Sequence, residues 1–184
     1  QTEAAVFSGN DLALKFDKHL DVLRGYDVKP RYLDSIRKYL LEYDGYSCNA
    51  FKVINFKGID IRQIFSDSGV LSIIDPGKMS VSFSEAGIAR FIVTCRILYW
   101  GSPAILLGAC PSASYENTFL DDYYGSMRAS NKTLELFIMK EILKHWVMAH
   151  KSLQKRNWNT CVKLLLKKVY IACLLSVIGF LKHV

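Results

Sequence analysis

The sequence predicts an α+β fold that is predominantly helical, with a small β-hairpin among packed helices. Hydrophobic residues make up 51% of the 184 positions, and only four Pro interrupt the chain. Apolar residues recur at near-helical spacing in six segments, whereas residues 51–75 alternate or are β-prone. A chain of this length buries a substantial core, so we predict one domain over residues 1–184.

Two helices are predicted near the start of the chain. Residues 10–24 place leucines and a phenylalanine among charges at near-helical spacing, with Asn10 available as an N-cap and Gly25 as the stop. Pro30 stands at the first position of a second amphipathic helix, which ends at Gly45. We expect the two to form a helical hairpin.

The β-prone region follows these helices. Residues 51–56 alternate, and the tight-turn signal Asp67-Ser-Gly69 separates the short runs 61–65 and 70–74. We therefore predict a β-hairpin with a loop in front of it. Helical spacing then returns over residues 85–99, 115–124, 132–151 and 157–182.

The C-terminal residues 169–181 are uncharged but number only thirteen, short of the roughly 20 that span a bilayer. A buried terminal helix is the favoured interpretation. The alternative is contact with an anionic membrane surface or an acidic ligand through Lys163, Lys167 and Lys168, although lysines beside a core helix are usually just solvated.

The net charge of +7 is unevenly distributed. Residues 140–184 carry nine Lys or Arg against one acid, whereas residues 1–139 carry fifteen against sixteen. No specific nucleic-acid signal accompanies this basicity. The five cysteines form neither a CxxC motif nor a Cys/His pair at zinc spacing, so we expect a reducing, cytoplasmic setting. The N-terminus resembles no secretory signal and lacks Met, which suggests a fragment or a processed chain.

The first candidate site residue, Asp75, lies in the stretch Val70-Leu-Ser-Ile-Ile-Asp-Pro-Gly-Lys-Met79. Asp75 follows a β-prone run and precedes Pro-Gly, so it is either a metal ligand or the residue that opens a turn. Two later runs bear on this choice: Glu85-Ala-Gly-Ile-Ala-Arg-Phe-Ile92 and Thr118-Phe-Leu-Asp-Asp-Tyr-Tyr-Gly125.

In order and spacing, these motifs resemble the C-terminal lobe of protein-kinase-like phosphotransferases, and of the aminoglycoside and choline kinase-like families in particular. The resemblance covers most of residues 10–184. Asp75-Pro-Gly77 stands at the family's Asp-Phe-Gly, and Gln63 lies twelve residues earlier, where the family has an Asn ligand.

The resemblance implies ATP and Mg²⁺ as cofactors and a small hydroxylated molecule or a sugar as phosphoryl acceptor. Asp75 and Gln63 would hold the metal ion. The other implied site residues are Asp60 as a doubtful catalytic base and Lys57, Arg62 and Lys78 as phosphate contacts. The alternatives are a loop-capping role for Asp60 and simple solvation of the three cations.

The chain departs from the family pattern at several positions. Phe56 and Gly58 stand where the family has the His and the catalytic Asp, and Gly87 replaces a further Asp. No glycine-rich phosphate loop is present, so we expect the N-terminal lobe to be absent.

Three hypotheses remain open from the sequence. The first is a phosphotransferase lobe that depends on a separate N-terminal lobe. The second is a non-catalytic, pseudokinase-like binding or scaffold domain, which the replaced motif residues favour. The third is an unrelated helical interaction protein.

Overall fold

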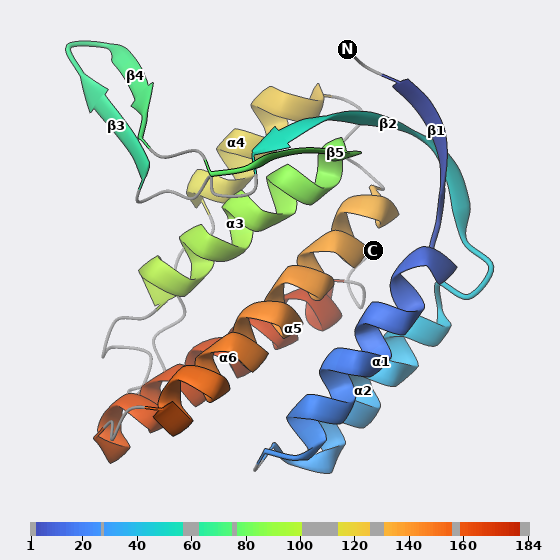
Figure 1. Cartoon of the computed structure of the whole chain (residues 1–184), viewed down its shortest axis with the longest axis vertical. Helices are drawn as coiled ribbons and strands as arrows, with labels where there is room; N and C mark the ends of the chain where they lie inside the picture. The colour runs from blue at the N-terminus through green and yellow to red at the C-terminus, as the bar shows by residue number, and fades with distance from the viewer. Residues whose placement is uncertain are drawn as a thin grey trace.

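The structure is a computed structural model of the chain, and it describes residues 3–26, 28–56, 63–74, 77–100, 114–125, 131–155 and 159–180. The fold is α+β and mainly helical, as the sequence predicts (Figure 1). Its helices are α1 (Asn10–Arg24), α2 (Pro30–Leu41), α3 (Ser84–Trp100), α4 (Ser114–Tyr124), α5 (Lys132–Lys155) and α6 (Thr160–Phe180).

Five strands form two separate antiparallel sheets. β1 (Glu3–Ser8), β2 (Ser47–Phe56) and β5 (Met79–Phe83) form one sheet in the order β1-β2-β5. β3 (Ile64–Asp67) and β4 (Val70–Ile73) form a hairpin of their own. In Figure 1 the larger sheet crosses one end of the helices, and the hairpin projects away from the body.

Helix α5 is the centre of the core. Its neighbours are α1, α3 and α6, and it buries apolar side chains on several faces, among them Ile142, Leu143 and Trp146. A helix that is apolar on more than one side is stable only when other elements surround it. The Asn131 side chain accepts a hydrogen bond from the Leu134 amide at 2.9 Å and so caps the start of α5.

The predicted β-hairpin is confirmed, including its turn. Ser68 and Gly69 have φ values of 48° and 81°, the left-handed conformations that a two-residue turn of type I′ needs at both central positions. The Ile74 amide donates to the Gln63 carbonyl at 2.9 Å, which continues the pairing beyond the strands.

The prediction of one β-hairpin was incomplete. Residues 51–56 belong to the longer strand β2, which pairs with β1 on one side and with β5 on the other. We missed β1 and β5 because both are short edge strands. Their partner is distant in sequence, so no local hairpin signal announces either strand.

The helix predictions are confirmed to within a few residues at their ends. The helix predicted over 157–182 is α6, and four of its residues, Val169, Tyr170, Cys173 and Leu174, are buried in the core. Within the described part of the chain, no helix is both long and apolar enough to cross a membrane. Among the described cysteines, Cys48 and Cys161 are free thiols.

Candidate functional site

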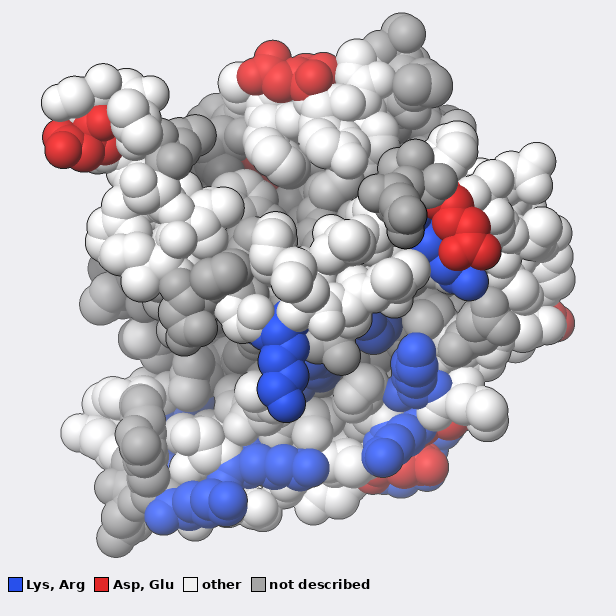
Figure 2. All heavy atoms as spheres, turned by 45° about the horizontal axis from the view of Figure 1, so that its top comes forward, with Lys and Arg blue, Asp and Glu red and all other residues white. Residues whose placement is uncertain are grey.

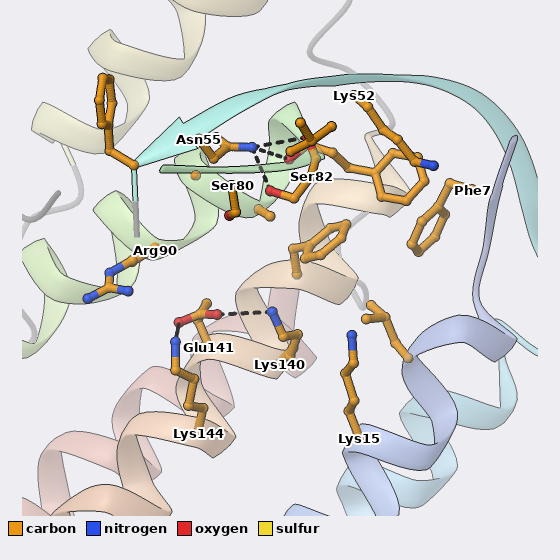
Figure 3. Close-up of a pocket in the computed structure, with 17 residues that line it drawn as sticks. Phe7, Lys15, Lys52, Asn55, Ser80, Ser82, Arg90, Lys140, Glu141 and Lys144 are labelled. Atoms are coloured by element: carbon orange, nitrogen blue, oxygen red, sulfur yellow. Dashed lines mark hydrogen bonds and ion pairs between the residues drawn. The ribbon is translucent and has the colours of Figure 1, made fainter. Parts of the chain in front are cut away.

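A cavity of about 420 Å³ lies between the three-stranded sheet and helices α1, α3 and α5 (Figure 3). Among the described residues, five cationic side chains from four elements line it, together with a single acid, Glu141. We call this cavity the basic cleft; its cations are Lys15, Lys52, Arg90, Lys140 and Lys144.

The core positions these cations. Lys15 lies between the buried Leu12 and Phe16 of α1, and its own side chain is exposed. Lys140 and Lys144 lie one turn apart on α5, beside the fully buried Met139. The packing that fixes the helices therefore also sets the spacing of the charges.

Aromatic rings at the floor of the basic cleft support two of the lysines. Phe7, Phe83 and Phe137 form one cluster, in which the Phe7 ring centroid is 5.3 Å from that of Phe83 and 5.5 Å from that of Phe137. The Lys52 ammonium lies 5.7 Å from the Phe83 centroid, and that of Lys140 lies 5.3 Å from the Phe137 centroid. Cation–π contacts at these distances restrict the lysine side chains before any ligand arrives.

Both carboxylate oxygens of Glu141 are engaged by neighbouring lysines. Lys140 Nζ is 3.1 Å from Oε1, and Lys144 Nζ is 2.8 Å from Oε2. Burial alone would raise the pKa of Glu141, but the two adjacent ammonium groups outweigh it and hold the pKa below its ordinary value. Glu141 is therefore ionised and paired at neutral pH, which does not suit it to act as a proton acceptor.

Asn55 provides the fixed polar group of the cleft. Its Nδ2 lies 2.7 Å from Ser82 Oγ, 3.1 Å from the Ser82 carbonyl and 3.0 Å from the Phe83 carbonyl. Gly87 makes this arrangement possible, because a Cβ at position 87 would overlap Asn55 Oδ1 and lie 3.3 Å from Asn55 Cγ. The glycine that departs from the kinase pattern is thus explained by local packing.

Arg90 contributes a guanidinium group from α3. Its Nε is buried and has no hydrogen-bond partner among the described residues. A buried donor without a partner costs free energy, and such groups are common at sites that bind a ligand. In Figure 3 the Arg90 side chain extends from α3 on the side of the cleft occupied by Glu141 and Lys144.

The structure describes only part of the site that the sequence predicts. Asp60, Lys57, Arg62 and Asp75 lie outside the described residues. Gln63 is half-buried beneath the hairpin, where its carbonyl accepts the Ile74 amide.

Lys78 is exposed just before β5 and does not line the basic cleft. Nor do the described residues contain a group of three or more His, Cys, Asp or Glu side chains that could hold a metal ion.

The five cations of the basic cleft were not predicted from the sequence. They are separated by up to 129 positions and follow no motif, so only the tertiary fold brings them together. One local signal existed: Lys140 and Lys144 are four residues apart on one helix face and flank Glu141.

Comparison of the sequence with models of known families, with curated proteins and with solved structures gives no match. The resemblance to phosphotransferases therefore rests on the sequence motifs alone.

Proposed function

We propose that this chain is a kinase-like lobe that binds a phosphate-bearing small molecule, such as a nucleotide, in the basic cleft. The observation that carries this proposal is the set of five cations around one cavity against a single acid that is already paired. Figure 2 shows Lys and Arg side chains gathered over the middle and lower part of one face, where few acids lie.

The charge of the cleft favours a polyanion over a simple carboxylate. Five cations and one acid leave an excess of four positive charges at neutral pH. Charges gathered in a concave site concentrate the field and attract oppositely charged ligands. Lys and Arg are also the side chains that bind phosphate oxygens most strongly, and Asn55, Ser80 and Ser82 add polar groups to the same wall.

The sheet connects the cleft to the segments that carry the kinase-like motifs. Phe56 and Met79 are paired at the ends of β2 and β5, and Phe56 lines the cleft. Residues 57–62 follow Phe56 directly in the sequence, and the segment Asp75-Pro-Gly-Lys78 directly precedes Met79. Both predicted phosphate-handling segments are therefore joined in sequence to paired residues of the sheet, one of which lines the cleft.

Calorimetric titration with ATP and with inorganic tripolyphosphate tests the binding proposal. Both should bind, because the phosphates supply most of the attraction. Replacing Lys15 and Lys52 together (Lys15→Gln, Lys52→Gln) should weaken binding by about tenfold or more, since each lost charge contact contributes on the order of 1 kcal/mol. Lys18→Gln, an exposed change on the same helix as Lys15, is the matched control and should change affinity less than about twofold.

Two results would reject this proposal. One is the absence of binding by either probe to the wild-type chain. The other is an equal loss of affinity in the Lys18→Gln control, because the attraction would then come from net charge and not from the cleft.

A second candidate function is phosphoryl transfer from ATP to a small hydroxylated acceptor or a sugar. The hydrogen bond between the Ile74 amide and the Gln63 carbonyl favours it, because it joins the chain next to Asp75 with the other predicted Mg²⁺ ligand. Carboxylate and amide oxygens suit Mg²⁺, which would neutralise phosphate charge during transfer. Asp60 would accept the hydroxyl proton in this reaction.

Mg²⁺-dependent ATP consumption separates the two candidates. A lobe that only binds should show ATP affinity without turnover, and Asp75→Ala should leave that affinity nearly unchanged. A phosphotransferase should consume ATP in the presence of an acceptor and lose this activity in Asp75→Ala. We also propose a reducing, cytoplasmic setting, in keeping with the free thiols of Cys48 and Cys161.

A further inference from the structure

A second cavity, of about 670 Å³, lies between α5 and α6 and extends to Tyr26 beyond the end of α1. It is separate from the basic cleft, and the described lining residues of the two cavities do not overlap. We call it the aromatic groove; its rings are Tyr26, Trp146, His150 and Tyr170.

The four rings form a continuous column. Tyr26 and His150 stack with centroids 4.6 Å apart and planes 8° apart, and Trp146 and Tyr170 stack at 5.9 Å and 4°. Trp146 and His150 are linked at 6.4 Å. Trp146 and Tyr170 are buried in the core and support the half-buried rings of Tyr26 and His150. The groove therefore has a preformed apolar wall and needs little rearrangement to accept a ligand.

The polar part of the groove is cationic. Lys155, Lys163 and Lys167 line it, and no Asp or Glu is among its described lining residues. Burial, together with the charge of Lys167, lowers the pKa of His150 below its ordinary value, so this ring is mostly neutral at pH 7 and belongs to the apolar wall. The groove therefore combines one apolar surface with one strongly positive edge.

We propose that the aromatic groove binds an amphiphilic anion, a small molecule whose apolar or aromatic body packs on the rings while its carboxylate, sulfate or phosphate head meets the lysines. Its volume is in the usual range of small-molecule sites, roughly 300 to 1,000 Å³. A ligand with several charges and no apolar part would gain nothing from the apolar wall, so the groove and the basic cleft select different molecules.

The occupant is a free molecule and not the surface of a bilayer. Lys163 and Lys167 line the groove, whereas the neighbouring Lys168 is exposed and does not. An anionic bilayer would attract all three lysines with comparable strength, because exposed cations near such a surface contribute similarly to the binding free energy. The affinity for a molecule within the groove would depend on Lys163 and Lys167 but not on Lys168.

Calorimetry with laurate tests this proposal, with dodecanol and dodecylammonium as probes of equal chain length and different head group. Laurate should bind most tightly, dodecanol about tenfold more weakly or worse, and dodecylammonium most weakly of all, because only laurate satisfies the lysines. A reversed order would overturn the proposal.

Matched variants locate the site. Lys163→Gln combined with Lys167→Gln should reduce laurate affinity by about tenfold, whereas Lys168→Gln should leave it unchanged within about twofold. Ala149→Trp fills the groove and should abolish binding; circular dichroism checks its folding, and the lysine variants decide the matter if it does not fold.

Vesicles of mixed neutral and anionic phospholipid complete the test. The proposal expects no more than weak binding to them. Tight vesicle binding that falls equally in Lys163→Gln, Lys167→Gln and Lys168→Gln would show that these lysines contact a membrane surface, and it would overturn the proposed ligand site. Unchanged ATP affinity in these variants would show that the groove and the basic cleft act independently.

Discussion

Replacing Gly87 by Ala tests the local structure on which the basic cleft depends. In an ordinary helix this change stabilises by up to about 1 kcal/mol. Here the new Cβ would overlap Asn55 Oδ1, so the Asn55 carboxamide must move away from its three acceptors on Ser82 and Phe83. Each lost hydrogen bond costs about 1 kcal/mol, so we expect Gly87→Ala to destabilise the protein by about 1 to 2 kcal/mol.

A double-mutant cycle isolates this clash. In an Asn55→Ala background the obstacle is gone, and Gly87→Ala should then be neutral or stabilise by up to about 1 kcal/mol. Urea unfolding followed by circular dichroism gives the free energy of unfolding for the four proteins. If Gly87→Ala stabilised both backgrounds equally, the packing of Asn55 against α3 would be wrong, and with it the fixed polar wall of the cleft.

Three further predictions concern stability. Arg96 and Glu116 form a buried ion pair between α3 and α4, with Nε donating to Oε2 at 2.8 Å. Glu116→Ala removes the carboxylate that this buried guanidinium contacts, and it should cost about 3 to 5 kcal/mol in urea unfolding. Folding lowers the pKa of Glu141, so its contribution to stability is complete above the ordinary carboxyl pKa and is lost as the pH falls through the folded pKa. Below about pH 4.5 the difference in unfolding free energy between wild type and Glu141→Gln should therefore shrink. A constant difference from about pH 7 to about pH 3 would contradict the pairing of Glu141 with the lysines. Gly69 has a φ of 81°, so Gly69→Ala should destabilise by about 1 kcal/mol, while the exposed Ser66→Ala on the same hairpin should change stability by less than about 0.5 kcal/mol.

The helices could be predicted because their signals are local. Helix α1 occupies the predicted residues 10–24, and α2 begins at Pro30, where the fixed φ of proline suits the first turn. The turn at Ser68 and Gly69 is also local, since two residues set its backbone conformation. Such features need no knowledge of the rest of the chain.

The larger sheet could not be predicted in the same way. Phe7 is buried against Phe83 and Phe137, residues far along the chain, and nothing within residues 3–8 indicates that contact. The pairing of β2 with β1 and β5 follows from tertiary packing, which sequence periodicity does not report.

The candidate site also depends on tertiary packing and could not be predicted from local sequence signals. The kinase-like motifs drew attention to Asp75 and Gln63, because metal ligands follow recognisable spacings. The basic cleft instead uses isolated cations such as Lys15 and Arg90, each of which alone looks like a solvated surface charge. Only the packing of α1, α3 and α5 beneath the sheet converts them into a site.

Amide chemical shifts recorded during titration with ATP test the central claim most directly, because they report where the ligand binds. We predict shifts in β2 near Lys52 and Asn55, in β5, in the first turn of α3 and at residues 140–144 of α5, with residues 160–170 of α6 unaffected. Shifts that gather on α6, or the absence of any change at saturating ATP, would contradict the assignment of the basic cleft as the phosphate-binding site.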